Sequence, residues 1–202
     1  MTPSDIRPIL WREGALYALD QRLLPRKQAF VRLGSSTEVS HAIRDMLLRG
    51  APLIGVAAAY GYALAAKGGG KTPQAALTRL EREGERLLAS RPTAVNLAYA
   101  VRRMEARAQA LADRGRRDLF APLLQEARAI HREDLEMNRR IARAGAALLG
   151  RGSTVMTHCN AGALATSGIG TALGVVGRAH ALGKVCRVYA CELVRNISPV
   201  LC

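Results

Sequence analysis

The fold is decided by the stretch STVMTHCNAG at residues 153–162, which predicts a buried strand over residues 153–158 and a turn directly after it. A helical pattern follows over residues 166–182, and a second strand is expected over residues 185–191. Parallel strands need a crossover connection of this kind, so the three elements predict one strand–helix–strand unit of a parallel sheet. One unit cannot cover both faces of such a sheet. We therefore expect the start of a Rossmann-like parallel α/β domain that is incomplete.

The residues before this unit predict a helical region that follows a small sheet. Short apolar runs and turn formers within residues 9–33 predict an antiparallel sheet. The first helix is expected after the capping sequence at residues 35–38. The second, over residues 54–66, is apolar on all sides and should be buried. Later helices are expected at residues 73–89, 94–112 and 119–149.

The fold class expected from these patterns is α/β, in two domains. The first domain, at residues 1–120, combines the small antiparallel sheet with helices. The second, at residues 121–202, consists of a linking helix and the first strand–helix–strand unit. Open α/β sheets bind ligands beyond the carboxyl ends of their strands, so we expect the functional site just after residue 158.

Composition limits the expected partners and location. The net charge is +14, from 30 basic and 16 acidic residues, but the arginines are scattered among glutamates and aromatic residues are scarce, so we expect no nucleic-acid partner. No apolar run reaches the roughly 18 residues of a membrane-spanning helix, and the N-terminus lacks the pattern of a secretory signal. We therefore expect a cytoplasmic protein without a membrane partner. The cysteines form no CxxC pair, so we expect free thiols and no metal site at Cys159, Cys186, Cys191 and Cys202.

Cys159 is the residue whose position most clearly suggests chemistry. It follows a predicted strand and precedes a predicted helix, whose N-terminus would stabilise a thiolate that acts as an acid/base or a nucleophile. The alternative is a small apolar residue that fills the strand end. His158 should face the opposite way and be structural. The backbone N–H groups after Cys159 suit an anion such as phosphate, although glycine at such a turn more often meets only a steric need.

Two arginines lie at predicted breaks between helices. Arg49 precedes Gly50, Ala51 and a proline, and Arg91 precedes another proline. Guanidinium groups suit bidentate phosphate binding, so the two side chains could clamp a sugar phosphate. The alternative is that they are capping or solvated arginines. Glu192 follows the second strand and could face the same crevice, or it could be an acid of a surface loop.

Four segments together resemble the methylthioribose-1-phosphate isomerase family, which belongs to the wider group containing the regulatory subunits of translation initiation factor 2B. The match runs in order along nearly the whole chain, and its first and third segments are the most specific. The segments are LRGAPLIGVAAAYG at residues 48–61, SRPTAVNL at 90–97, THCNAGALAT at 157–166 and VYACE at 188–192.

The resemblance implies an aldose–ketose isomerase that converts 5-methylthioribose 1-phosphate to 5-methylthioribulose 1-phosphate in methionine salvage, without a metal or organic cofactor. The family uses a catalytic cysteine and an aspartate, and Cys159 matches the cysteine. Arg49, Gly50, Ala51 and Arg91 match positions that contact the substrate and its phosphate. The family forms homodimers mainly through the second domain, most of which we expect this chain to lack, so dimerisation is not expected here.

The chain departs from the family pattern after residue 192. The family continues with Thr-Arg-Pro, whereas this chain reads LVRNISPVLC over residues 193–202. The family's aspartate and a later Asn-Lys pair have no counterpart, so the resemblance implies a C-terminally truncated chain that is inactive by itself. Two alternatives stay open at this stage: a non-catalytic regulatory or binding relative of the initiation factor 2B subunits, and an isomerase of another ribose phosphate.

Overall fold

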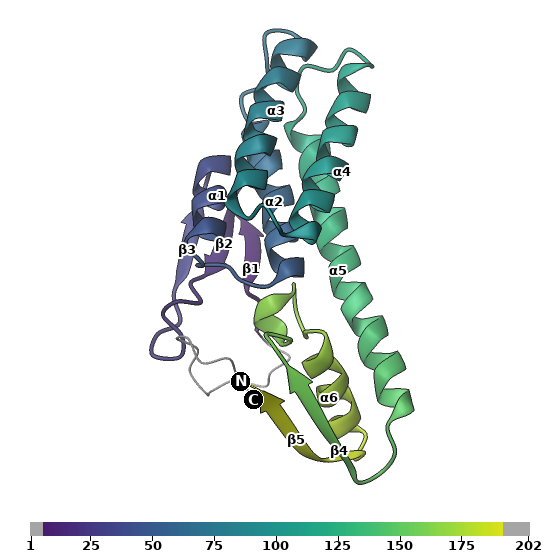
Figure 1. Ribbon diagram of the computed structural model, residues 1–202. Coiled ribbons are helices and arrows are strands. Elements are labelled where there is room, and N and C mark those ends of the chain that lie inside the picture. Colours follow the sequence, from purple (N-terminus) through teal and green to yellow (C-terminus); the bar gives the residue numbers. More distant parts are fainter. Residues whose placement is uncertain (1–5, 192–202) are drawn as a thin grey trace.

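The computed structural model describes residues 6–191 (Figure 1). The chain begins with an antiparallel sheet, which confirms the first prediction. Its strands, in sheet order, are β1 (Ile9–Arg12), β2 (Ala15–Leu19) and β3 (Phe30–Leu33). Glu13 and Gly14 connect β1 to β2, and their φ angles of 51° and 70° are typical of a tight hairpin turn.

Two shorter helices follow the sheet. Helix α1 (Ser36–Arg44) begins with the predicted cap: the Ser35 side chain accepts from the Glu38 N–H, and the Glu38 side chain accepts from the Ser35 N–H. Helix α2 (Ala51–Ala65) is buried over most of its length, as its uniformly apolar sequence predicts. It starts three residues earlier than expected, because proline is well tolerated in the first turn of a helix.

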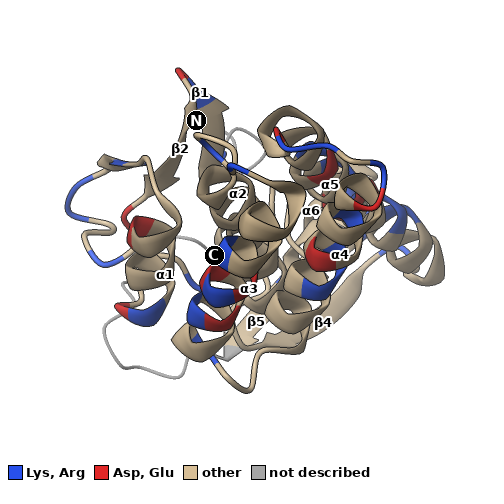
Figure 2. Ribbon diagram, turned by 90° about the horizontal axis from the view of Figure 1, so that it is seen from above, with Lys and Arg blue, Asp and Glu red and all other residues tan. Residues whose placement is uncertain are grey.

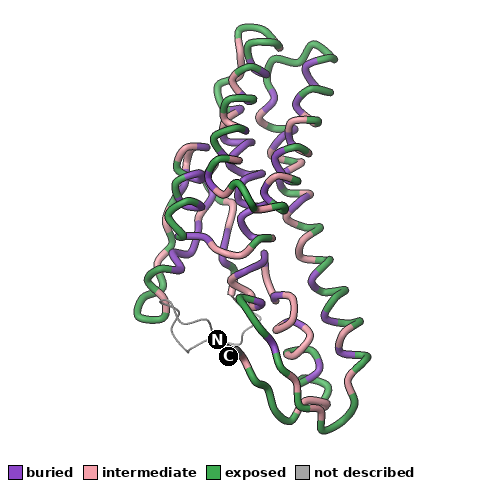
Figure 3. The backbone as a smooth tube through the Cα atoms, viewed as in Figure 1, coloured by how far each residue is buried: buried purple, intermediate pink, exposed green. Residues whose placement is uncertain are grey.

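Three long helices surround α2. They are α3 (Pro73–Ser90), α4 (Val95–Ala112) and α5 (Phe120–Leu148). Helix α2 contacts all three, together with α1 and β2. The buried residues therefore gather along α2 and along the inward faces of its neighbours (Figure 3). Helix α5 extends well beyond this group towards the second sheet (Figure 1).

The second sheet is parallel, as predicted, and has two strands within the described residues. Its elements are β4 (Ser153–His158), the short helix η2 (Ala163–Ala165), α6 (Ala172–Ala181) and β5 (Val185–Cys191). Helix α6 packs between the strands and the C-terminal part of α5. The opposite face carries Met156 and its register partner Tyr189, which are 72% and 49% exposed. The structure thus confirms the α/β class, with one sheet face uncovered among residues 6–191.

A larger difference from the prediction lies at α6, because the helix expected from residue 166 begins at Ala172. The Thr166 hydroxyl accepts the N–H groups of Gly168 and Gly170, which holds the chain in a turn instead of a helix. Gly170 has a φ of +86°, and a Cβ there would lie 2.6 Å from the Ala161 carbonyl oxygen. The glycines therefore serve close backbone packing before the helix starts.

Charged residues of both signs are distributed over the described structure. Lys and Arg lie on several helices and loops, with Asp and Glu interspersed among them (Figure 2). Within residues 6–191, no helix combines the length and the apolar character needed to cross a membrane.

Candidate functional site

Cys159 lies directly after β4, where the chain leaves the sheet. Its φ angle is 68°, a left-handed conformation that is uncommon for a residue with a side chain and is often found at functional sites. The residue is exposed, which contradicts the alternative that it fills a buried strand end. His158, which was expected to face the other way and to be structural, is also exposed.

The helix N-terminus expected behind Cys159 is absent from the described structure. Helix α6 begins only at Ala172, and the influence of a helix dipole is confined to its first turn. Stabilisation of a Cys159 thiolate by this dipole was therefore a wrong prediction. A folded loop, residues 159–171, occupies the place of the expected helix start, and we call it the Cys159 loop.

The Cys159 loop is tied down at its base and at two points along its length. At the base, the Ala161 carbonyl accepts the Thr171 N–H at 2.9 Å. Further along, the buried Gln21 side chain donates to the Leu164 carbonyl at 2.8 Å. A third bond runs from the Ser167 N–H to a carboxylate of α5 at 2.8 Å. These bonds connect the loop to the first sheet and to α5, so its conformation depends on distant parts of the chain.

The start of α2 packs directly against the Cys159 loop. Gly50 has a φ of +97°, and a Cβ at this position would lie 2.4 Å from the Cα of Ala165. Only glycine allows so close an approach of two backbones. The structure therefore brings Arg49, Gly50 and Ala51 to the loop that begins at Cys159, and Figure 1 shows η2 just beneath the N-terminal end of α2.

The two predicted arginines are connected through one turn: Arg49 belongs to the segment between α1 and α2, and Arg91 contacts that segment from the end of α3. Arg91, at the C-terminal cap of α3, donates to the sulfur of Met46 at 2.9 Å. Met46 lies three residues before Arg49, in the turn that leads into α2. Arg49 is half-buried, and its Nε atom has no hydrogen-bond partner among residues 6–191. Among residues 6–191, no hydrogen bond joins either guanidinium group to the Cys159 loop.

Residues that sequence reasoning missed lie beneath this site. Gln21 supports the Cys159 loop from the first sheet, and its Oε1 atom is buried without a partner in the described structure. Beside it, Asp20 is nearly fully buried, and its hydrogen bond from Arg22 holds the pKa of its carboxyl below the usual range. Asp134 of α5 accepts the Ser167 N–H. Of these residues, only Asp134 could have been noticed in the sequence, because Asn138 follows it one helical turn later within an arginine-rich helix.

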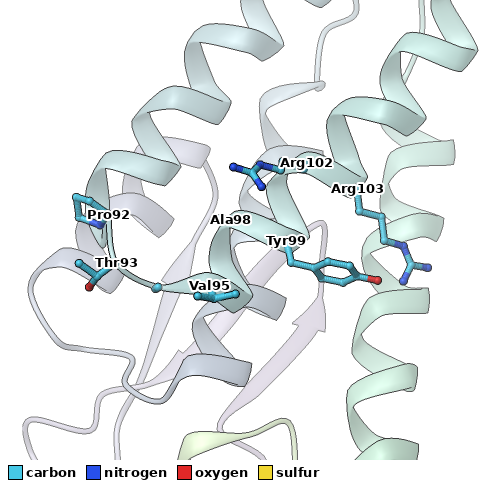
Figure 4. Close-up of a pocket in the computed structure, with 8 residues that line it drawn as sticks. Pro92, Thr93, Val95, Ala98, Tyr99, Arg102 and Arg103 are labelled. Atoms are coloured by element: carbon cyan, nitrogen blue, oxygen red, sulfur yellow. The ribbon is translucent and has the colours of Figure 1, made fainter.

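A groove next to Arg91 was also missed. It has a volume of about 560 Å³ and is lined by Pro92, Thr93, Ala94, Val95, Ala98, Tyr99, Arg102 and Arg103. Figure 4 shows Pro92 and Thr93 in the segment that leads into α4, and Val95 to Arg103 along its first turns, with the Tyr99 ring turned towards Arg103 and α5. Val95 and Tyr99 are 79% and 60% exposed. Their spacing of four residues is typical of a core-facing pattern, so periodicity alone does not predict a groove here.

The arrangement combines an exposed thiol, two guanidinium groups and a loop with free backbone donors. No acceptor within residues 6–191 takes the N–H groups of Gly162, Ala163 or Leu164. Such groups bind anions well, phosphates in particular. The described residues contain no cluster of three or more metal-ligating side chains. Glu192, the other residue considered for this crevice, lies outside the described residues.

Comparisons with known proteins identify relatives of this chain. The methylthioribose-1-phosphate isomerase of Ectopseudomonas mendocina is 48% identical over 93% of this chain and 53% of its own length. The enzyme of the same name from Anaeromyxobacter is 49% identical over 95% of this chain and 54% of its own length. The chain thus spans about half the length of the curated relatives it matches.

Solved structures show the same relationship. The crystal structure of 5-methylthioribose 1-phosphate isomerase from Pyrococcus horikoshii superimposes with a TM-score of 0.83 at 36% identity, over 92% of this chain and 52% of that one. Translation initiation factor eIF-2B, subunit delta, from A. fulgidus gives 0.78 at 39% identity, over 93% of this chain and 54% of that one. The sequence profile described as "Initiation factor 2 subunit family" matches residues 47–194. Because this match includes most of the chain, with Arg49, Arg91 and Cys159, the chain belongs to the initiation factor 2 subunit family.

Proposed function

We propose that this protein takes part in the isomerisation of 5-methylthioribose 1-phosphate to 5-methylthioribulose 1-phosphate, a step of methionine salvage. The observation that carries the proposal is the packing of Gly50 against Ala165, because it brings the Arg49 segment to the loop that presents Cys159. Relatives named for this activity share 48% and 49% identity with the chain. We place the protein in the cytoplasm as part of this proposal, because its substrate would be a soluble metabolite.

Each site residue has a task that its chemistry suits. Arg49 and Arg91 would hold the phosphate through charge-assisted hydrogen bonds. Gly50 and Ala51 would let the backbone approach the sugar closely. The reaction opens a sugar ring and moves hydrogen from C2 to C1, so it needs groups that give and take protons. Cys159 would be one of these groups, and the proposal assigns no metal or organic cofactor.

Binding of the sugar phosphate tests the proposal. Titration calorimetry with 5-methylthioribose 1-phosphate should show binding that Arg49→Ala and Arg91→Ala each weaken. Cys159→Ser should abolish any turnover, measured as ketose formation, and should leave most of the affinity. Cys186→Ser is the matched control, because Cys186 is also exposed but lies on β5. An absence of binding by the unaltered protein would refute the proposal.

The similarity to an initiation factor subunit favours a second candidate, a binding or regulatory role without chemistry. The same groups would then hold a phosphorylated ligand, and Cys159 would be dispensable. The turnover assay separates the two: both candidates should retain their affinity in Cys159→Ser, but a binding protein should never form ketose, whereas an isomerase should form it only while Cys159 is present. An isomerase of another ribose phosphate would show turnover with that sugar instead.

A further inference from the structure

Asp134 is a residue of α5 whose side chain contacts the Cys159 loop, and both of its carboxylate oxygens accept hydrogen bonds. One oxygen accepts the Ser167 N–H at 2.8 Å. The other accepts the Asn138 side-chain amide at 3.1 Å, and the same amide donates to the Asp134 carbonyl at 2.8 Å. Asn138 is only 2% exposed, so it holds the carboxylate in one orientation, aimed at the loop.

The bond from Ser167 reaches the middle of the loop, far from its base. Thr166 and Ser167 are 0% and 4% exposed, and Thr166 organises the turn around them through its hydroxyl. A hydrogen bond to a carboxylate is about twice as strong as one between neutral groups. Among residues 6–191, Asp134 therefore provides the strongest hydrogen bond between the Cys159 loop and α5.

The link bears on Cys159 because the loop is short and closed. The Ala161 carbonyl, two residues after Cys159, accepts from Thr171 and thereby closes the loop. A left-handed φ at Cys159 persists only where the surroundings impose it. Fixing the loop at Ser167 and at its base imposes that conformation and also holds Ala165 against Gly50.

We propose that Asp134 is a positioning residue for Cys159: it orders the Cys159 loop so that the thiol and the Arg49 segment keep their relative placement. The proposal rests on the proposed function in assigning importance to Cys159. Its tests need no sugar phosphate, so a failure of the isomerase proposal would be seen separately.

The first measurement is amide hydrogen exchange of residues 160–171. Asp134→Ala removes both contacts and should speed exchange of the hydrogen-bonded amides of this segment, at Ala165 to Gly168, Gly170 and Thr171, by about tenfold or more, the effect of losing a hydrogen bond to a charged group. Glu133→Gln is the matched control, because the neighbouring carboxylate pairs with Arg103 and does not touch the loop. This control should exchange like the unaltered protein. Unchanged exchange in Asp134→Ala would overturn the proposal.

The second measurement follows Cys159 itself, in a background where Cys186, Cys191 and Cys202 are serine. The rate of alkylation by iodoacetamide should move, in Asp134→Ala, towards the rate of the same chain unfolded in urea. Asp134→Asn should restore part of the original rate, since its amide oxygen can still accept the Ser167 N–H. Faster exchange with an unaltered Cys159 rate would show that Asp134 orders the loop without positioning the thiol, and would refute the proposal. If Asp134→Ala does not fold, Asp134→Asn and Glu133→Gln allow the same comparison.

Discussion

Replacing Gly50 by alanine tests the contact between the start of α2 and the Cys159 loop. The added Cβ would lie 2.4 Å from the Cα and 2.5 Å from the carbonyl oxygen of Ala165, and no rotamer change can move these backbone atoms away. The φ of +97° adds a strain of about 1–3 kcal/mol for a residue with a side chain. Overpacking adds about 1–3 kcal/mol. We therefore expect Gly50→Ala to lower the free energy of unfolding by about 2–6 kcal/mol.

Chemical denaturation followed by circular dichroism measures this loss. Gly115→Ala is the matched control, because Gly115 also has a positive φ, of +75°, but nothing lies within 4 Å of a Cβ there. The control should lose only the backbone contribution, about 1–2 kcal/mol. A loss in Gly50→Ala no larger than in Gly115→Ala would mean that the approach to Ala165 has no energetic cost, and the reasoning would be refuted.

Three further predictions follow from the site and the core. Arg91→Ala should weaken the binding of inorganic phosphate by about tenfold in a calorimetric titration, through the loss of a charge-assisted hydrogen bond, and an unchanged affinity would remove Arg91 from the site. Arg22 holds the pKa of Asp20 below 3.8, so this contribution to stability is fully present above that pH and is lost as the pH falls towards the lower folded value. Asp20→Asn should therefore flatten the acid limb of the melting temperature against pH. Burial lowers the pKa of His131, whose ring bonds the Tyr60 hydroxyl at 3.1 Å. The His131 ring therefore binds a proton at a higher pH in the unfolded chain than in the folded protein, so the free energy of unfolding should fall as the pH drops below 6.5. His131→Gln should remove this part of the pH dependence, which melting curves on either side of this pH would measure.

Most secondary structure could be predicted because it depends on local patterns. The capping sequence at Ser35 and Glu38 fixed the start of α1, and the uniformly apolar α2 could only be a buried helix. The strand–helix–strand pattern that begins just before Cys159 located the parallel sheet. The site residues themselves were selected from segments whose resemblance to a known family covered nearly the whole chain, and their roles stay predictions.

The features that escaped prediction depend on contacts between distant residues. The late start of α6 results from Thr166 bonding two nearby N–H groups, a competition that helical periodicity does not reveal. Asp134 and Gln21 support the Cys159 loop from elements far away in sequence. The groove at Tyr99 arises because the face of α4 that carries Val95 and Tyr99 is exposed among the described residues, and a core-like spacing cannot indicate this.

The hydrogen bond from Gln21 to Leu164 joins residues 143 positions apart, and this distance sets an order of assembly during synthesis. The first sheet and α1 to α4 consist of contacts that can form as the ribosome delivers them, because their partners are close in sequence. The contacts of Gln21 with Leu164 and of Gly50 with Ala165 can form only after the Cys159 loop has left the ribosome. Contacts that close the longest segments form late during folding. The nascent helical region should therefore be protected from protease before the loop docks, and the docking of the loop should be the last event that completes the site.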